Sequence, residues 1–172
     1  MKRSFTSLEP PEALQAAILI EERNAAVYRR FAQMFTELGD EESLEIAAVF
    51  WEMATEERGH HALLQQKYAE QYPDLICAVT EDELLERIEV PKLNDHEVLA
   101  ARNDGLLARK LALQVALQAE IGAQSYYANL VKQTPEGPLR QIYGDLAQVE
   151  EGHATYLSMK LGQDNAADQS VP

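Results

Sequence analysis

The stretch Glu57-Arg58-Gly59-His60 returns later in the chain as Glu150-Glu151-Gly152-His153, and this repeat decides the fold. In each copy a glutamate and a histidine are three residues apart, which places both side chains on one face of a helix. A Glu-x6-Tyr motif precedes each copy, first as Glu21 and Tyr28 and then as Glu120 and Tyr127. Two Glu-x-x-His pairs and two single glutamates form the ligand set of a two-metal site inside a four-helix bundle.

The spacing of apolar residues predicts an all-α chain with four long helices. Apolar side chains recur every three or four residues in four segments, and each motif interrupts the middle of such a stripe. Proline at the start of a helix, glycine at its end and an N-cap aspartate set the expected bounds. These bounds are about Pro10 to Leu38, Asp40 to Tyr72, Gly105 to Gln133, and Thr134-Pro135 to Gly162.

The connections predict how these helices are arranged. Helices one and two are joined by a short turn, as are helices three and four, so each pair forms a hairpin. A long crossover from Pro73 to about Asp104 joins the hairpins; Thr80 and Glu83 predict a short helix in it, and Asn94 and Glu97 another helix start. This is a ferritin-like four-helix bundle over residues 1–162, followed by a polar, disordered tail at 163–172.

Composition narrows the function classes. The 172 residues carry a net charge of -14, from 15 basic and 29 acidic side chains. Nucleic acid and anionic membranes are therefore excluded as expected partners, and cations are favoured, although an acidic excess also keeps a protein soluble. Cys77 is the only cysteine, so an internal disulfide, a four-cysteine metal site and a CxxC pair are excluded. We find no membrane-spanning run and no signal peptide, and expect a cytoplasmic location.

Four glutamates on apolar stripes require an explanation. Burial of an unpaired carboxylate costs several kcal/mol, and facing carboxylates also repel one another. Protonation with raised pKa values is one resolution, and metal binding is the other. Two divalent ions balance four carboxylates, while neutral imidazoles add ligands without charge, which favours two metals over one. The predicted metal ligands are Glu21, Glu57, His60, Glu120, Glu150 and His153.

Position within the motifs predicts the role of each ligand. Glu57 and Glu150 each share a helical turn with a histidine and are expected to bridge the metals, whereas Glu21 and Glu120 each bind one metal. Oxygen and nitrogen ligands without thiolate suit iron or manganese, and zinc or copper can also occupy such sites. Tyr28 and Tyr127 have two readings: a hydrogen bond to a ligand carboxylate, or core packing with the hydroxyl near water.

Other polar residues near the motifs are not expected to be ligands. His61 lies off the apolar stripe, and His96 lies in the crossover. The glutamates beside the motifs point about 100° away from the ligand face on a helix and are expected to be solvated, or less often to guide cations inward. These are Glu22, Glu56 and Glu151.

The two Glu-x6-Tyr and two Glu-x-x-His motifs resemble those of the rubrerythrin family within the ferritin-like superfamily, over about residues 10 to 160. The resemblance implies a carboxylate-bridged di-iron site, redox chemistry with peroxide or dioxygen, and often a homodimer, sometimes with exchanged helices. The chain departs from the family in two ways. It lacks the four cysteines of a rubredoxin domain, so reducing electrons would come from a separate partner. It also has Ala123 where rubrerythrins carry an extra glutamate, with Asn24 at the equivalent place on the first helix.

The expected function is therefore that of a di-iron redox protein that oxidises Fe(II) with hydrogen peroxide or dioxygen, as a peroxidase or a ferroxidase. The first alternative is a non-catalytic metal-binding or iron-storage module that holds iron, manganese or zinc. The second is a structural bundle whose buried glutamates are protonated.

Overall fold

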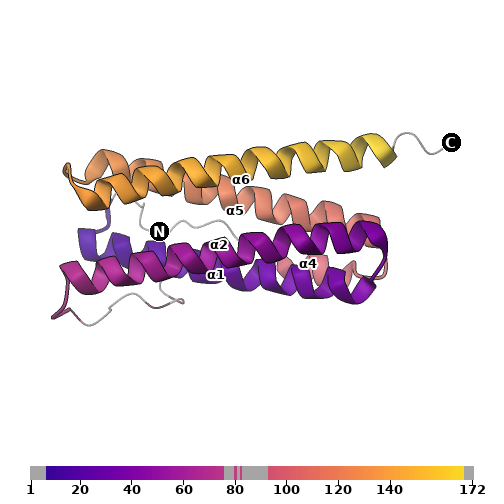
Figure 1. Cartoon of the computed structure of the whole chain (residues 1–172), viewed down its shortest axis with the longest axis horizontal. Helices are drawn as coiled ribbons and strands as arrows, with labels where there is room; N and C mark the ends of the chain where they lie inside the picture. The colour runs from indigo at the N-terminus through magenta and orange to yellow at the C-terminus, as the bar shows by residue number, and fades with distance from the viewer. Residues whose placement is uncertain (1–6, 76–79, 81, 83–92, 169–172) are drawn as a thin grey trace.

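The computed structural model describes residues 7–75, 80, 82 and 93–168, and the regular elements in this part of the chain are all helical (Figure 1). The all-α prediction is confirmed. The long helices and one short helix are α1 (Pro10–Leu38), α2 (Glu41–Gln71), α4 (Asp95–Ala100), α5 (Gly105–Gln133) and α6 (Pro138–Asp168).

The helix ends follow local chemistry. Asp40 caps α2 by accepting a hydrogen bond from the backbone N–H of Ser43 at 3.0 Å, and Asp104 caps α5 by accepting one from the N–H of Leu107 at 3.1 Å. Gly39 ends α1 at a φ of 73°, a left-handed conformation that glycine adopts without a Cβ clash. The bounds of the first three long helices therefore agree with the sequence to within about a residue.

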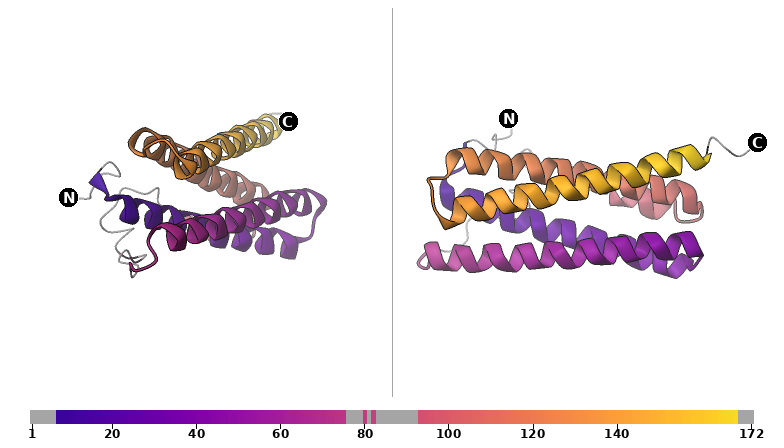
Figure 2. Two further views of the ribbon diagram at one scale, coloured as in Figure 1. Left: turned by 60° about the vertical axis from the view of Figure 1, so that its left-hand side comes forward. Right: turned by 45° about the horizontal axis from the view of Figure 1, so that its top comes forward.

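The four long helices form two antiparallel hairpins, α1 with α2 and α5 with α6 (Figure 2). The hairpins meet mainly along α1 and α5. The start predicted at Asn94 is confirmed as α4, and Arg30 of α1 holds this helix through an ion pair of 2.6 Å with Asp95. The capping box predicted at Thr80 and Glu83 cannot be followed, because Glu83 lies outside the described residues.

The buried side chains form two apolar clusters with a polar layer between them. One cluster surrounds Leu14 and Tyr143, and the other surrounds Phe31 and Phe50, whose rings meet edge to face with centroids 5.3 Å apart. Along α1 the first cluster ends before Glu21 and the second begins after Asn24, so α1 crosses the polar layer between them. The polar layer therefore lies between two apolar clusters.

Two expected boundaries of the last helix are wrong. Helix α6 begins at Pro138 rather than at Thr134-Pro135, and it continues past Gly162 to Asp168. A glycine inside a helix costs only about 1 kcal/mol relative to alanine, and no helix-breaking proline follows before Pro172. Residues 163–168 of the predicted disordered tail are therefore helical, and residues 169–172 are outside the described part of the chain.

Candidate metal centre

The structure brings the six sequence-predicted residues together in the middle of the bundle. Each of the four long helices contributes at least one side chain, because the motifs interrupt the inward-facing stripes. The four glutamates are fully buried, and the two histidine side chains are 16% exposed. The contributions are Glu21 from α1, Glu57 and His60 from α2, Glu120 from α5, and Glu150 and His153 from α6.

These residues form two overlapping groups, each of which could hold a metal ion. Within each group one ligand atom per residue lies within 4.8 Å of all the others. Glu57 and Glu150 belong to both groups. The first group is Glu21, Glu57, His60 and Glu150, and the second is Glu57, Glu120, Glu150 and His153.

The shared position of Glu150 is visible in its two oxygens. Its Oε1 lies 3.5 Å from Nδ1 of His60, and its Oε2 lies 3.6 Å from Nδ1 of His153. One carboxylate therefore spans both groups, which is the geometry that a bridging ligand needs. In each group the histidine Nδ1, rather than Nε2, points at the carboxylates.

The shared carboxylates have no hydrogen bonds to satisfy them. Both oxygens of Glu57 and both of Glu150 are buried without a hydrogen-bond partner among the described residues. Burial, followed by the charges of Glu21 and Glu150, raises the pKa of Glu57 well above its usual value. Burial and the adjacent Glu120 carboxyl likewise raise the pKa of Glu150. Buried carboxylate oxygens of this kind are what a bound cation would satisfy, so the residues present fit a metal site.

The pKa shifts of Glu120 and His153 favour their ionised forms. Burial acts to raise the pKa of Glu120, but interactions with Glu150, His153 and Tyr28 outweigh it and lower that pKa. Burial acts to lower the pKa of His153, but the Glu120 and Glu150 carboxylates outweigh it and raise this pKa to about 11. Without a cation, His153 therefore supplies positive charge to the layer.

Two tyrosine hydroxyls each donate a hydrogen bond to a carboxylate of the opposite hairpin, those of Glu21 and Glu120, which belong to one ligand group each. Tyr28 of α1 donates a hydrogen bond to Oε1 of Glu120 on α5, and Tyr127 of α5 donates one to Oε1 of Glu21 on α1. In each case the second oxygen faces a histidine, at 3.1 Å for Glu21 and His60 and at 3.3 Å for Glu120 and His153.

Both tyrosines are fully buried, and burial followed by the neighbouring carboxylate raises their pKa values well above the usual range. They therefore remain protonated donors. Of the two readings left open by the sequence, the structure shows the hydrogen bond to a carboxylate.

Sequence reasoning missed the role of Glu56. We expected this residue to be solvated, but its Oε2 lies 2.7 Å from Nε2 of His153. A hydrogen bond from Nε2–H to Glu56 orients the imidazole, so that Nδ1 faces the carboxylates and could act as the ligand atom when a metal is bound. No local signal marks Glu56, because its partner lies on another helix. The equivalent residue before Glu150 is Val149, and His60 has no hydrogen bond at Nε2 within the described part of the chain.

The remaining candidates lie apart from this layer. His61 lines a hollow of about 290 Å³ on the outer side of α1 and α2, together with Arg29 and Trp51. His96 is exposed beside Glu97 in α4. Neither histidine belongs to a metal-binding group among the described residues.

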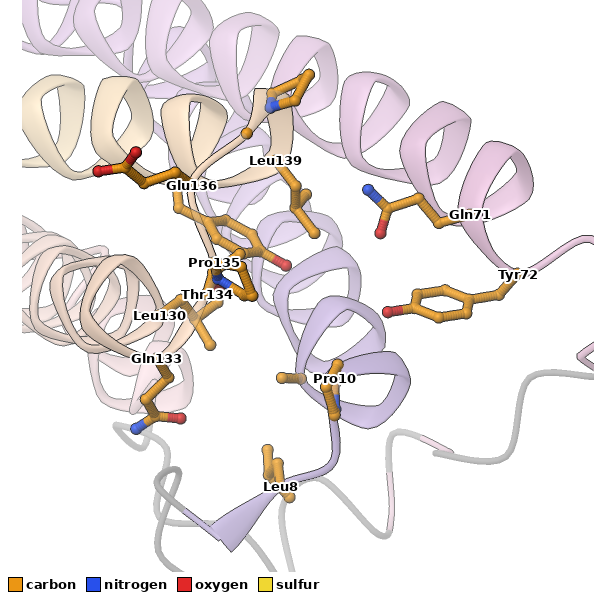
Figure 3. Close-up of a pocket in the computed structure, with 14 residues that line it drawn as sticks. Leu8, Pro10, Gln71, Tyr72, Leu130, Gln133, Thr134, Pro135, Glu136 and Leu139 are labelled. Atoms are coloured by element: carbon orange, nitrogen blue, oxygen red, sulfur yellow. The ribbon is translucent and has the colours of Figure 1, made fainter.

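A separate hollow lies at one end of the bundle, where the first turn of α1 meets the turn between α5 and α6 (Figure 3). It encloses about 430 Å³, and Tyr72, Pro135 and Leu139 are among its lining residues. None of the six clustered residues lines it, so this hollow is distinct from the candidate metal centre.

No described helix is both long enough and apolar enough to cross a membrane.

Comparisons with known proteins address the family and the fold. The profile of the rubrerythrin family matches residues 12–96, which hold the first Glu-x6-Tyr motif and the first Glu-x-x-His motif. A hypothetical protein from Pyrococcus furiosus has a similar fold, with a TM-score of 0.57 and 20% sequence identity over 89% of this chain and 90% of that chain. No curated protein matches the chain. The second hairpin carries the same two motifs outside the matched region. The match over residues 12–96 supports placing the chain in the rubrerythrin family of ferritin-like proteins.

Proposed function

We propose that this protein binds two iron ions and oxidises Fe(II) with hydrogen peroxide or dioxygen. The observation that supports this most directly is the sharing of Glu57 and Glu150 between two ligand groups. A single ion would leave the second histidine and terminal glutamate unused and several buried carboxylates unbalanced. Two divalent ions balance the four carboxylates, and the absence of thiolate favours iron or manganese over softer metals.

In this proposal Glu57 and Glu150 would be the ligands that the two ions share. Glu21 and His60 complete one position, and Glu120 and His153 complete the other. If bound as a pair, two ferrous ions would each supply one electron and become ferric. With uptake of two protons, these two electrons would reduce one hydrogen peroxide to two waters, or one dioxygen to hydrogen peroxide.

The residues of the chain determine how such a site would work. The hydroxyls of Tyr28 and Tyr127 fix the terminal carboxylates, so the ligand set needs little rearrangement to bind metal. The apolar clusters on either side keep the layer dry, which strengthens the electrostatic interactions within it. The partial exposure of His60 and His153 indicates the side from which ions and small oxidants reach the layer.

A decisive test combines metal analysis with oxidation kinetics. Protein loaded anaerobically with Fe(II) is expected to hold two irons per chain and to oxidise both with one equivalent of hydrogen peroxide, seen as ferric absorbance in a stopped-flow instrument. Glu57→Ala is expected to abolish this reaction, while Glu52→Ala, an exposed glutamate on the same helix, is the matched control. Loading of iron without any oxidation by either oxidant contradicts the enzyme proposal.

The competing function is storage or binding of iron, manganese or zinc without turnover. One observation favours it: with a single cysteine, the sequence offers no four-cysteine site to return electrons to oxidised iron. A peroxidase cycle would therefore need a separate electron donor, whereas a ferroxidase would release the ferric product. Repeated peroxide additions with and without a reductant separate a peroxidase from a ferroxidase or a storage protein. Only a peroxidase supplied with a reductant consumes more than one equivalent per site.

We also propose a cytoplasmic homodimer, by analogy with the family. Light scattering after gel filtration tests the dimer, and a monomeric mass contradicts it.

A further inference from the structure

Asn24 is a buried amide with no hydrogen-bond partner among the described residues. Its side chain is fully buried, and neither Oδ1 nor Nδ2 has a hydrogen-bond partner among the described residues. Buried amides in proteins are almost always hydrogen-bonded, because an unmade hydrogen bond destabilises the fold. Asn24 therefore presents two polar atoms that a bound ligand could satisfy.

The two tyrosine hydrogen bonds place Asn24 at the level between the two metal positions. Tyr28 reaches Glu120, and Tyr127 reaches Glu21, so α1 and α5 run antiparallel with these residues paired. Asn24 lies about midway between Glu21 and Tyr28 on the same face of α1. It is therefore level with the gap between the His60 group and the His153 group.

The residue at the equivalent level of α5 is small. Midway between Glu120 and Tyr127 on α5 is Ala123, which is 2% exposed and presents only a methyl group. The two shared carboxylates come from α2 and α6. At the level between the two groups, α1 and α5 therefore present an amide and a small residue, whereas α2 and α6 present the shared carboxylates.

The internal repeat argues that the amide is not required for packing. Ligands and tyrosines are identical in the two halves, yet the residue three positions after the first glutamate is Asn24 in one half and Ala123 in the other. The same position therefore accepts an apolar residue, so a polar side chain there is not needed to build the helix or the layer.

We propose that Asn24 binds hydrogen peroxide at the level between the two metal-binding groups and makes the site select peroxide over dioxygen; this inference rests on the proposed function. An amide offers an NH₂ donor and a carbonyl acceptor. Hydrogen peroxide has both lone pairs and O–H groups, so it matches both atoms of the amide. Dioxygen has no hydrogen to donate and leaves the carbonyl unpaired. A site that hydrogen-bonds one substrate disfavours an analogue that lacks the matching group.

The test compares wild type with Asn24→Leu, which keeps the volume but removes both polar atoms. Each protein is loaded anaerobically with Fe(II), its iron content is measured, and the rates with peroxide and with dioxygen are recorded separately. We expect the rate constant with peroxide to fall by about tenfold or more, the effect of losing a pair of hydrogen bonds, while the rate with dioxygen is unchanged. The double variant Asn24→Ala and Ala123→Asn moves the amide from α1 to α5. It is expected to restore much of the preference for peroxide over dioxygen.

A second measurement does not depend on turnover. In zinc-loaded protein, which is redox-inert, the side-chain amide signal of Asn24 in a ¹H–¹⁵N NMR spectrum is expected to shift as hydrogen peroxide is added. The melting temperature of Asn24→Leu is expected to equal or exceed that of wild type. If Asn24 is structural, the melting temperature falls and both oxidants slow together, and the inference is overturned.

The failures can be told apart. Wild-type protein that binds iron but oxidises it with neither reagent refutes the proposed function and this inference with it. Wild-type protein that reacts with peroxide while Asn24→Leu keeps the same ratio of the two rates refutes only the role of Asn24.

Discussion

The hairpin α1–α2 and the hairpin α5–α6 carry the same ligands but different surroundings. Each supplies one single glutamate, one Glu-x-x-His pair and one tyrosine. The first hairpin also supplies Glu56, which holds His153, and the buried amide of Asn24. The second has Val149 and Ala123 at these places. The comparison teaches that the ligand set is symmetric while its support is not, so two metals bound here would be inequivalent.

The strongest test of the symmetric ligand set removes a shared carboxylate from one hairpin at a time. Glu57→Ala and Glu150→Ala are each expected to reduce bound metal from two ions per chain to nearly none, because both groups lose a ligand. Glu21→Ala and Glu120→Ala each disturb one group only and are expected to leave about one ion. Metal content after gel filtration measures this. Equal losses in all four variants would mean that the glutamates are not divided into shared and terminal ligands.

The pH dependence of the metal-free protein tests the same layer without metal. The pKa values of Glu57 and Glu150 are raised above the usual 4.5, and that of His153 is raised from 6.5 to about 11. Groups with raised pKa values stabilise the fold fully below their unfolded pKa and lose this contribution as pH rises through the folded pKa. The lowered pKa of Glu120 acts in the opposite sense, but only as the pH falls below about 4.5.

The melting temperature of metal-free protein is therefore expected to fall between pH 6 and pH 9. Zinc-saturated protein is expected to show a smaller fall, because metal displaces the protons. Glu57→Gln and Glu150→Gln should reduce the slope similarly, since each hairpin provides one of these groups. Differential scanning calorimetry with and without a chelator measures both slopes, and identical slopes would contradict this account of the layer.

Much of this arrangement could be predicted from the sequence because it depends on local spacing. The apolar stripes place Glu57 and His60 on one inward face, and the caps at Asp40 and Asp104 locate two helix starts. Six residues on four such stripes can converge only in the middle of a bundle. The end of α6 was mispredicted because a single glycine is a weak stop signal.

The pairings between hairpins could not be predicted, because local spacing does not fix how one helix is positioned against another. The sequence left open whether Tyr28 meets any carboxylate, and it gave no sign that the partner is Glu120. It also placed Glu56 in solvent, although a long side chain at the edge of the ligand face can reach a neighbouring helix. Packing between helices decides both contacts.

Exchanging the supporting residues tests the asymmetric part. Glu56→Val removes the hydrogen bond to His153 and is expected to weaken metal binding at that position by about 10- to 100-fold, with little effect at the His60 position. Val149→Glu places a carboxylate at the equivalent position of the other half and is expected to strengthen the His60 position. Calorimetric titration with zinc resolves two binding steps if their affinities differ.

The double variant makes this test sharper. With Glu56→Val and Val149→Glu combined, the tighter position is expected to move from His153 to His60. Glu52→Val, an exposed change on the same helix, is the control for altered surface charge. Two binding steps that keep their order in the double variant would show that the asymmetry has another origin.

The smallest effects are expected from the tyrosines, which differ from Glu56 in being present in both halves. Tyr28→Phe removes one hydrogen bond to Glu120, and Tyr127→Phe removes one to Glu21. Each loss is expected to cost about 1 kcal/mol in metal affinity, because the carboxylate keeps its contact with a histidine but loses its fixed orientation. The two substitutions act on opposite metal positions, since each hydroxyl crosses to the other hairpin. Zinc titration of each variant should therefore weaken a different step, and a single step weakened by both would mean that the tyrosines act through packing instead of through their carboxylate partners.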